Sequence, residues 1–222
     1  MTGSADVLVV MAKYPAPGAV KTRLAERVGA GAACALYRAF LADIAGRHAH
    51  GPWSLVWAVT PANADLAPFV GAAGRQIAQE GGDLGERMRR CFERLLGEGV
   101  ERVVMIGADA PHVADTVLHA AFAALGDDDA VFVPTRDGGY CLVGMRAPHD
   151  IFSGIPMGTS AVFEATCTRL ETLGLRWRAL ETSFDIDELE DVAELARLIA
   201  TGGVTLPHTS AVLRDCRAAG LL

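Results

Sequence analysis

Short apolar runs that alternate with longer amphipathic segments constrain this chain more than any other feature. The runs of strand length cover residues 6–12, 53–59, 75–79, 102–108, 130–134, 139–146 and 177–184. Apolar residues at helical spacing, as at Leu36, Phe40 and Ile44, indicate helices between them. We expect these helices over 29–48, 83–97, 113–125, 159–173 and 188–201. Such alternation is typical of a doubly wound sheet, so it predicts a Rossmann-like three-layer α/β/α sandwich.

One pair of runs departs from the parallel pattern. Val131–Pro134 and Tyr140–Gly144 are joined by Arg136–Gly139, a linker that allows a hairpin-like return. We therefore expect a mixed, mostly parallel sheet with one antiparallel strand. Because no repeat or Pro/Ser-rich linker divides the 222 residues, we expect a single domain over 1–222. The packing of the 203–222 tail is not predicted.

Composition excludes several classes of function. A formal net charge of -7 argues against a general nucleic-acid or membrane-surface binder, since both need a broad positive field. No run approaches the roughly 18 apolar residues of a membrane span. The 5 cysteines never form C-x-x-C, which favours reduced thiols over zinc sites or disulfides. We expect a cytoplasmic protein with no nucleic-acid or membrane partner.

Residues 13–24 form a basic loop directly after the first apolar run. Lys13, Lys21 and Arg23 supply its charge, and Gly18 and two prolines shape it. Ligands of open parallel sheets bind beyond the carboxyl ends of the strands, and a basic loop with free N–H groups suits phosphate. The loop is no P-loop, because Val20 and not glycine stands directly before Lys21, and no G-x-G-x-x-G follows the strand. An ordinary solvated loop is the alternative.

Three aspartates follow later runs and are candidates to bind a cation. Asp109 closes the fourth run, and Asp185 and Asp187 follow the seventh. Residues i and i+2 of an extended chain point to one side, and Mg²⁺ prefers such carboxylate oxygens. Structural interpretations compete with this one. Asp109 is also typical of a turn or helix cap, and Asp187 with Glu190 matches a capping pattern for the next helix.

Two glycine-containing segments are weaker candidates. Asp83 and Glu86 form a capping pair at a helix start whose N–H groups suit a nucleotide's sugar or base. Gly138 and Gly139 would let a ligand approach the backbone, although a tight turn needs the same glycines.

Other conspicuous residues have simpler interpretations. His112 has no second His or Cys at metal-ligand spacing, so we interpret it as a bystander. The run Asp127-Asp128-Asp129 lies at the wrong sheet edge and is interpreted as solvated charge. Trp53 and Trp57 are interpreted as core residues.

Five segments stand in order along residues 5–200: Ala12–Leu24, Gly82–Met88, Ile106–Pro111, Pro134–Tyr140 and Phe184–Asp187. In that order they resemble the motifs of a bacterial GT-A-fold glycosyltransferase-like family, related to 2-phospho-lactate guanylyltransferase and the molybdenum-cofactor guanylyltransferases. The resemblance implies the nucleotide-diphospho-sugar transferase fold. It also implies that Lys21 and Arg23 bind nucleotide phosphates and Asp83 the nucleoside. Asp109, with Asp185 or Asp187, would hold Mg²⁺ or Mn²⁺.

The chain departs from the family at two positions. Ala110 stands where serine often follows the metal-site Asp, and Met157-Gly158 stands where tryptophan commonly precedes Ser or Thr. Both positions concern the acceptor, so the acceptor is not inherited from any relative.

The leading hypothesis is a Mg²⁺-dependent nucleotidyltransferase that acts on a nucleoside triphosphate and a small phosphorylated or acidic acceptor. Lys21, Arg23 and Asp109 would be its catalytic residues, through charge neutralisation. The nucleotide contacts expected beside Lys21, Arg23 and Asp83 come from Lys13, Gly18, Gly138 and Gly139. The alternatives are a glycosyltransferase with a nucleotide-sugar donor and a non-catalytic nucleotide-binding module.

Overall fold

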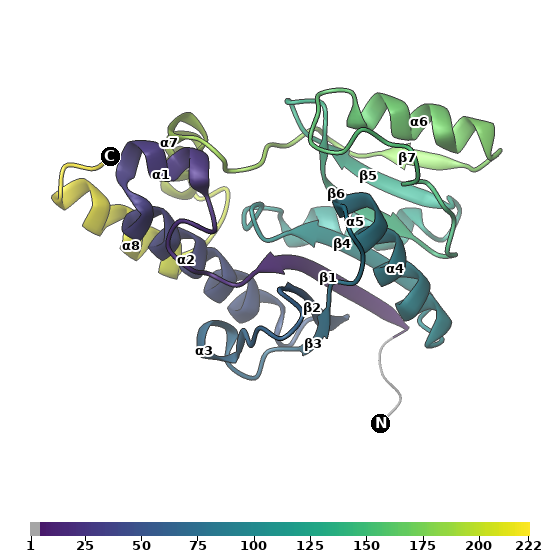
Figure 1. Ribbon diagram of the computed structural model, residues 1–222, viewed down its shortest axis with the longest axis horizontal. Helices are drawn as coiled ribbons and strands as arrows, with labels where there is room; N and C mark the ends of the chain where they lie inside the picture. The colour runs from purple at the N-terminus through teal and green to yellow at the C-terminus, as the bar shows by residue number, and fades with distance from the viewer. Residues whose placement is uncertain (1–4) are drawn as a thin grey trace.

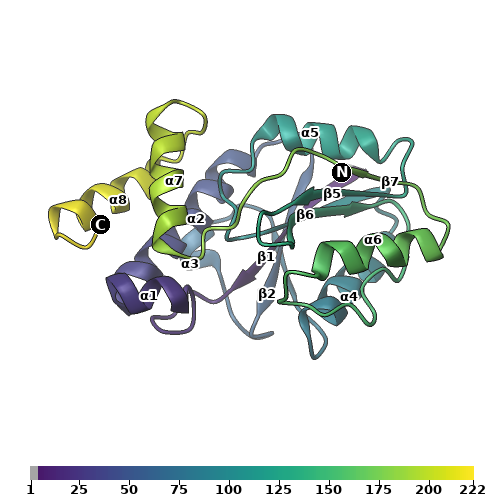
Figure 2. The same cartoon turned by 90° about the horizontal axis from the view of Figure 1, so that it is seen from above.

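A computed structural model describes residues 5–222 and contains a 7-stranded sheet with helices on both faces (Figures 1 and 2). The spatial order of the strands is β3-β2-β1-β4-β6-β5-β7. Their bounds are β1 Asp6–Lys13, β2 Ser54–Thr60, β3 Arg75–Ala78, β4 Arg102–Gly107, β5 Ala130–Pro134, β6 Tyr140–Met145 and β7 Trp177–Ala179. The helices are α1 Thr22–Val28, α2 Ala30–His48, α3 Ala67–Val70, α4 Leu84–Gly97, α5 Asp115–Ala124, α6 Val162–Thr172, α7 Leu189–Ala200 and α8 Pro207–Ala218.

Strand β6 is antiparallel to both of its neighbours, β4 and β5, whereas the other pairings are parallel. The chain reverses after β5 through a turn in which Thr135 N donates to Gly139 O and Gly138 N donates to Thr135 O. The expected antiparallel return is therefore confirmed, as is the mixed, mostly parallel sheet. That the whole chain is one domain stays a prediction.

Alternate residues of the central strand face two separate layers of helices. Leu8 and Val10 of β1 pack in the cluster that contains α2 and α5, whereas Val7 and Val9 pack in the one that contains α4 and α6. Burial of each such side chain contributes about 1.5–3 kcal/mol, so this period-2 pattern fixes the sheet between its helices. Trp53 and Trp57 are buried in the α2/α5 cluster, which confirms their interpretation as core residues.

Three helices lie where none was predicted from the sequence. Helix α1 includes residues 22–24 of the predicted basic loop and buries only Leu24 and Val28, too few for a clear pattern. Helix α3 is 4 residues long. Helix α8 belongs to the tail: the carboxylate of Asp43, 2% exposed on α2, accepts hydrogen bonds from His208 N at 2.9 Å and Thr209 N at 2.8 Å. In both views α1, α7 and α8 gather at one end of the molecule (Figures 1 and 2).

Two sequence interpretations were wrong in detail. The last strand was expected to reach residue 184 but ends at Ala179, and only an isolated bridge between Thr135 and Ser183 continues its pairing. The aspartates at 127–129 are not merely solvated, since Asp128 pairs with Arg178 at 2.7 Å and Asp129 with Arg146 at 2.8 Å. These pairs lie at the start of β5, away from its carboxyl end.

Within residues 5–222, no helix is both long and apolar enough to cross a membrane.

Candidate functional site

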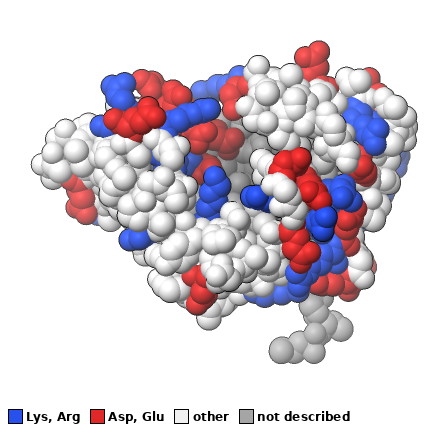
Figure 3. Space-filling view, in the orientation of Figure 1, with Lys and Arg blue, Asp and Glu red and all other residues white. Residues whose placement is uncertain are grey.

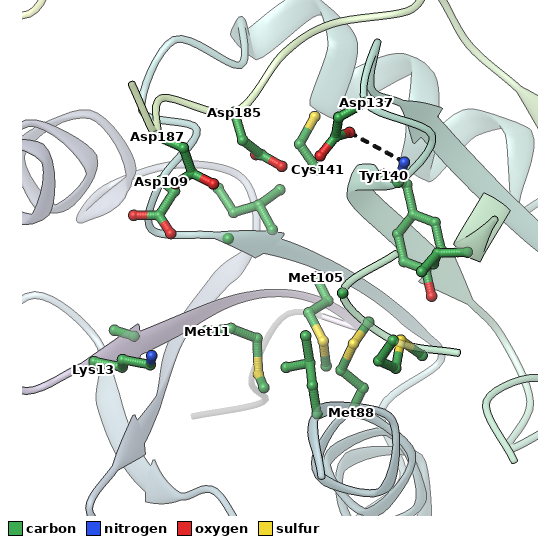
Figure 4. Close-up of a pocket in the computed structure, with 18 of the residues that line it drawn as sticks. Met11, Lys13, Met88, Met105, Asp109, Asp137, Tyr140, Cys141, Asp185 and Asp187 are labelled. Carbon is green, nitrogen blue, oxygen red and sulfur yellow. Dashed lines mark hydrogen bonds between the residues drawn. The ribbon is translucent and has the colours of Figure 1, made fainter. Parts of the chain in front are cut away.

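A cavity of about 750 Å³ opens at the carboxyl ends of β1 and β4. Figure 3 shows the hollow near the middle of one face, with basic and acidic side chains at its rim. Aspartates form one side of it, and Met11, Met88 and Met105 lie together on another (Figure 4). The cavity therefore has a charged part and an apolar part.

Lys21 is the buried basic residue of the charged part. Its side chain is 2% exposed, and its Nζ lies 2.6 Å from Asp109 Oδ1 and 2.9 Å from Asp187 Oδ1. Nζ also donates a hydrogen bond to the carbonyl oxygen of Ile186. Burial opposes the charged form of Lys21, but the two carboxylates outweigh it and raise the pKa of the ammonium. The alternative of an ordinary solvated loop is wrong for Lys21, because its partners come from segments 88 and 166 positions away in the chain.

The segments after β4 and β7 bring Asp109 and Asp187 together. Ile186 N donates to Asp109 O at 3.1 Å, so the two backbones are joined beside the ammonium. The carboxylates are 41% and 44% exposed, open to the cavity on the side away from Lys21. The pair therefore binds one cation while it faces solvent.

Capping does not explain either aspartate. Helix α5 begins after Ala114, so Asp109 caps no helix. The cap of α7 is Glu188, and it is Asp191 Oδ2 that accepts hydrogen bonds from Glu188 N at 2.8 Å and Asp187 N at 3.0 Å. The interpretation of Asp187 as a helix cap was therefore wrong, since its carboxylate points to Lys21 instead.

Asp185 lies deeper in the same cavity. Burial, followed by the like charges of Asp109 and Asp187, raises the pKa of its carboxyl to about 7. Among residues 5–222 no three His, Cys, Asp or Glu side chains are arranged to hold a metal as they stand. The donors nevertheless fit a hard cation, because Asp109 and Asp187 already converge on an ammonium and Asp185 is a third carboxylate beside them.

Arg23 and Lys13 complete the basic side of the cavity. The side chain of Arg23 is 69% exposed, with its Nη1 3.9 Å from both Asp187 and Glu188. Lys13 lines the cavity, and its backbone N–H donates to the hydroxyl of Tyr37 at 3.0 Å. Both cations are therefore accessible to an anionic ligand.

Of the remaining residues predicted to contact the nucleotide, only one lines the cavity. Gly139 lines the cavity, whereas Gly18, Asp83 and Gly138 are not among its lining residues. Asp83 caps α4 by accepting from Glu86 N at 2.8 Å, which confirms the capping pair. A Cβ on Gly138 would lie 2.0 Å from Ser160 O, so contact with this loop excludes any side chain there. Their nucleotide roles stay predictions.

His112 lies outside the cavity lining. Its ring stacks on Phe184 with 4.2 Å between centroids, and Nε2 lies 3.1 Å from Ser183 Oγ. Burial lowers its pKa to about 4, so the ring is neutral at pH 7. This packing agrees with its interpretation as a bystander.

Sequence reasoning missed several lining residues: Met11, Tyr37, Gln79, Met88, Met105, Asp137 and Cys141. A signal existed for two of them, because Met11 and Met105 each stand two residues before the end of a strand. Asp137 lies inside the segment Pro134–Tyr140, one of the five segments that resemble family motifs. It accepts from Thr135 Oγ1 at 2.5 Å and from Gly139 N at 3.1 Å, so it also shapes the turn.

Comparison with known proteins bears on the whole chain. The family model described as "Uncharacterized protein conserved in bacteria (DUF2064)" matches residues 44–159. A solved protein from Desulfovibrio desulfuricans G20, provisionally described as a nucleotide-diphospho-sugar transferase, is 34% identical. The match covers 97% of this chain and 96% of that protein, with a TM-score of 0.90. No curated protein matches the chain.

More distant solved structures share the architecture. CMP:2-keto-3-deoxy-manno-octonic acid synthetase complexed with CTP has a TM-score of 0.56 at 14% identity, over 89% of this chain and 99% of its own. A cytidylyltransferase from Leptospira borgpetersenii serovar Hardjo-bovis (strain JB197) has a TM-score of 0.57 at 13% identity, over 97% and 95%. At these identities the likeness concerns the fold alone. The D. desulfuricans protein confirms the predicted fold class. The family match and that protein also support the resemblance seen in the five segments.

Proposed function

This chain belongs to the DUF2064 family, and we propose that it is a nucleotidyltransferase acting on a nucleoside triphosphate and a small phosphorylated or acidic acceptor. One observation carries the proposal. Lys21 and Arg23 meet Asp109, Asp185 and Asp187 in a single cavity at the carboxyl edge of the sheet. Cations for a polyphosphate and oxygen ligands for a divalent metal are the two requirements of phosphoryl chemistry.

The proposed metal is Mg²⁺ or Mn²⁺, held by Asp109 together with Asp187 or Asp185. When bound, the cation would neutralise charge on the phosphates. The side chains of Asp109 and Asp187 are 41% and 44% exposed, so a cation can reach them from the cavity.

The basic residues neutralise the negative charge of the phosphates that the metal leaves uncompensated. Arg23, exposed and two residues beyond Lys21, binds the phosphate under attack, and its planar fork suits phosphate oxygens. Lys13 and Lys21 neutralise the leaving pyrophosphate. The nucleophile is the acceptor's own phosphate or carboxylate oxygen, which is already ionised, so no general base is required.

The acceptor occupies the apolar part of the cavity, against Met11, Met88 and Met105. Thioether side chains adapt to irregular shapes, so this wall suits the carbon skeleton of an acceptor whose charged end faces the metal. The nucleobase lies beside Gln79, which also lines the cavity.

The relatives support transferase chemistry on a nucleotide substrate. The D. desulfuricans protein is described provisionally as a nucleotide-diphospho-sugar transferase, and one distant neighbour was solved with CTP. The first description also supports a second candidate, a glycosyltransferase that uses a nucleotide-sugar donor at the same site. The free thiols of all 5 cysteines support a place of action in the cytoplasm.

The test is a screen with a chemical readout. Nucleoside triphosphates and nucleotide sugars are first compared by the thermal shift they produce with and without Mg²⁺. The best donor is then incubated with a panel of phosphorylated and carboxylic acids. Release of pyrophosphate from a triphosphate supports nucleotidyl transfer, whereas release of a nucleoside diphosphate from a nucleotide sugar supports the second candidate. Binding without either product would leave a nucleotide-binding module.

A further inference from the structure

The ammonium of Lys21 is enclosed by protein oxygens, and its side chain is only 2% exposed. Nζ donates to Asp187 Oδ1 at 2.9 Å and to the carbonyl oxygen of Ile186, and it forms an ion pair with Asp109 Oδ1 at 2.6 Å. In this arrangement Lys21 cannot also bind phosphate. Any phosphate contact therefore requires the ammonium to leave the carboxylate pair.

The ammonium also lies where a divalent cation would have to lie. Asp109 and Asp187 converge on one point, and that point is taken by Nζ. Two cations a few ångströms apart repel each other strongly in a partly buried site. The metal and the ammonium are thus competitors for the same two oxygens.

The backbone holds Lys21 in this place at a cost. Its φ of 50° and ψ of 46° are left-handed, and it is the single non-glycine residue with positive φ among residues 5–222. Such a conformation persists only where the surroundings enforce it, and it is typical of functional sites. Here it directs a side chain from the start of α1 under the carboxylates.

The choice of lysine is itself informative. The chain has two lysines, Lys13 and Lys21, and both line this cavity, while every other Lys/Arg position is arginine. An ammonium is a compact point charge, whereas a guanidinium forms a two-pronged pair with a carboxylate. A compact charge on a flexible stem is the group best able to exchange with a metal ion.

We infer that Lys21 is an exchangeable counter-ion that fills the metal position between Asp109 and Asp187 until a metal–triphosphate complex displaces it. This inference rests on the proposed function for the identity of the ligand. Free Mg²⁺ then binds weakly, because it must displace the ammonium without offering it a new partner. The metal–triphosphate complex binds well, because the released ammonium gains phosphate oxygens. Metal and nucleotide enter together.

The test measures metal binding in the absence of nucleotide, and its readout does not depend on enzymatic activity. Mn²⁺ is titrated into the wild type, Lys21→Met and Lys13→Met, with bound metal followed by calorimetry or electron paramagnetic resonance. Methionine keeps an unbranched side chain of similar length, and Lys13→Met is the matched control that removes a positive charge from the same cavity. We expect Lys21→Met to bind Mn²⁺ at least about tenfold more tightly than the wild type, and Lys13→Met to change the affinity by less than about threefold.

Equal or weaker Mn²⁺ binding by Lys21→Met would overturn the inference, since a lysine that only positions the carboxylates would lower the affinity when lost. If Lys21→Met does not fold, an NMR experiment on the wild type tests the inference instead. Protein labelled with ¹⁵N-lysine has two side-chain ammonium groups to observe by NMR. Millimolar Mg²⁺ alone is expected to leave the Lys21 signal in place, and Mg²⁺ with inorganic tripolyphosphate to move it. A shift by Mg²⁺ alone of the same size would contradict the exchange.

The two proposals fail separately. If no nucleotide binds, the Mn²⁺ titration of Lys21→Met still reports on the counter-ion. If a nucleotide binds and Lys21→Met gains no Mn²⁺ affinity, the proposed function stands and the exchange does not.

Discussion

Replacement of Asp185 by asparagine is expected to stabilise the protein at neutral pH and not at acidic pH. The wild-type carboxyl is buried beside Asp109 and Asp187, which raises its pKa from the ordinary 3.8 to about 7. A raised carboxyl pKa means that the folded state holds the proton more tightly than the unfolded state. The wild type therefore loses no folding stability to Asp185 below pH 4. The loss grows as the pH rises towards 7 and is complete above pH 7.

The size of the effect follows from the pKa shift. Each unit corresponds to 1.36 kcal/mol, so a shift of about three units sets an upper value of about 4 kcal/mol. Relaxation and solvent penetration reduce this figure, and we expect about 2–4 kcal/mol. In a chain of this size each kcal/mol moves the Tm by about 2–4 °C, so the increase at pH 8 is about 5–15 °C.

The assay is thermal unfolding of wild type and Asp185→Asn from pH 4 to pH 8 with a chelator present. Burial lowers the pKa of His48 and His112 to about 4, so both histidines cost stability as the pH falls below 6.5. That loss is common to both proteins and cancels in their difference. Asp127→Asn, at an exposed position, controls for the loss of one negative charge. If the Tm difference between wild type and Asp185→Asn is the same at pH 4 and pH 8, the carboxyl of Asp185 does not have a raised pKa in the folded protein.

Two further predictions separate ligand contacts from packing. Arg23→Ala is expected to weaken nucleotide binding about tenfold to a hundredfold, as for a lost charge-assisted contact of about 1.5–3 kcal/mol, while changing stability by less than about 0.5 kcal/mol. Calorimetric titration checks it against Arg27→Ala on the same helix; equal losses of affinity in the two variants would remove Arg23 from the site. Asp43→Ala is expected to cost about 2–4 kcal/mol and to expose the amides of α8 to hydrogen exchange, because two backbone N–H groups lose a buried carboxylate. Unchanged protection of α8 would show that its packing, and not Asp43, holds the tail.

The sequence predicted what depends on local periodicity. The strands, helices α2, α4, α5, α6 and α7, and the antiparallel return at Gly138-Gly139 follow from apolar spacing and turn residues, so they were within reach. Arg23 lies in the segment predicted as a basic loop, and its side chain is exposed. The carboxylates were correctly expected at one edge, because the ends of parallel strands meet there.

What the sequence could not show depends on partners distant in the chain. Lys21 is surrounded by loop-like residues, and its burial follows only from Asp109 and Asp187 folding over it. Asp187 has a capping pattern in sequence, yet Asp191 supplies the cap. The same holds for α8, whose docking depends on Asp43, 165 residues before it.

The charged part of the cavity is proposed to bind a triphosphate together with a divalent metal. The most direct test is calorimetric titration of the preferred nucleoside triphosphate into wild type and Asp109→Asn, each with Mg²⁺ and with a chelator, after circular dichroism has shown both to be folded. We predict binding by the wild type in Mg²⁺, and at least about tenfold weaker binding in chelator and in Asp109→Asn. Equal affinity under all four conditions, or no binding by any triphosphate, would contradict the account.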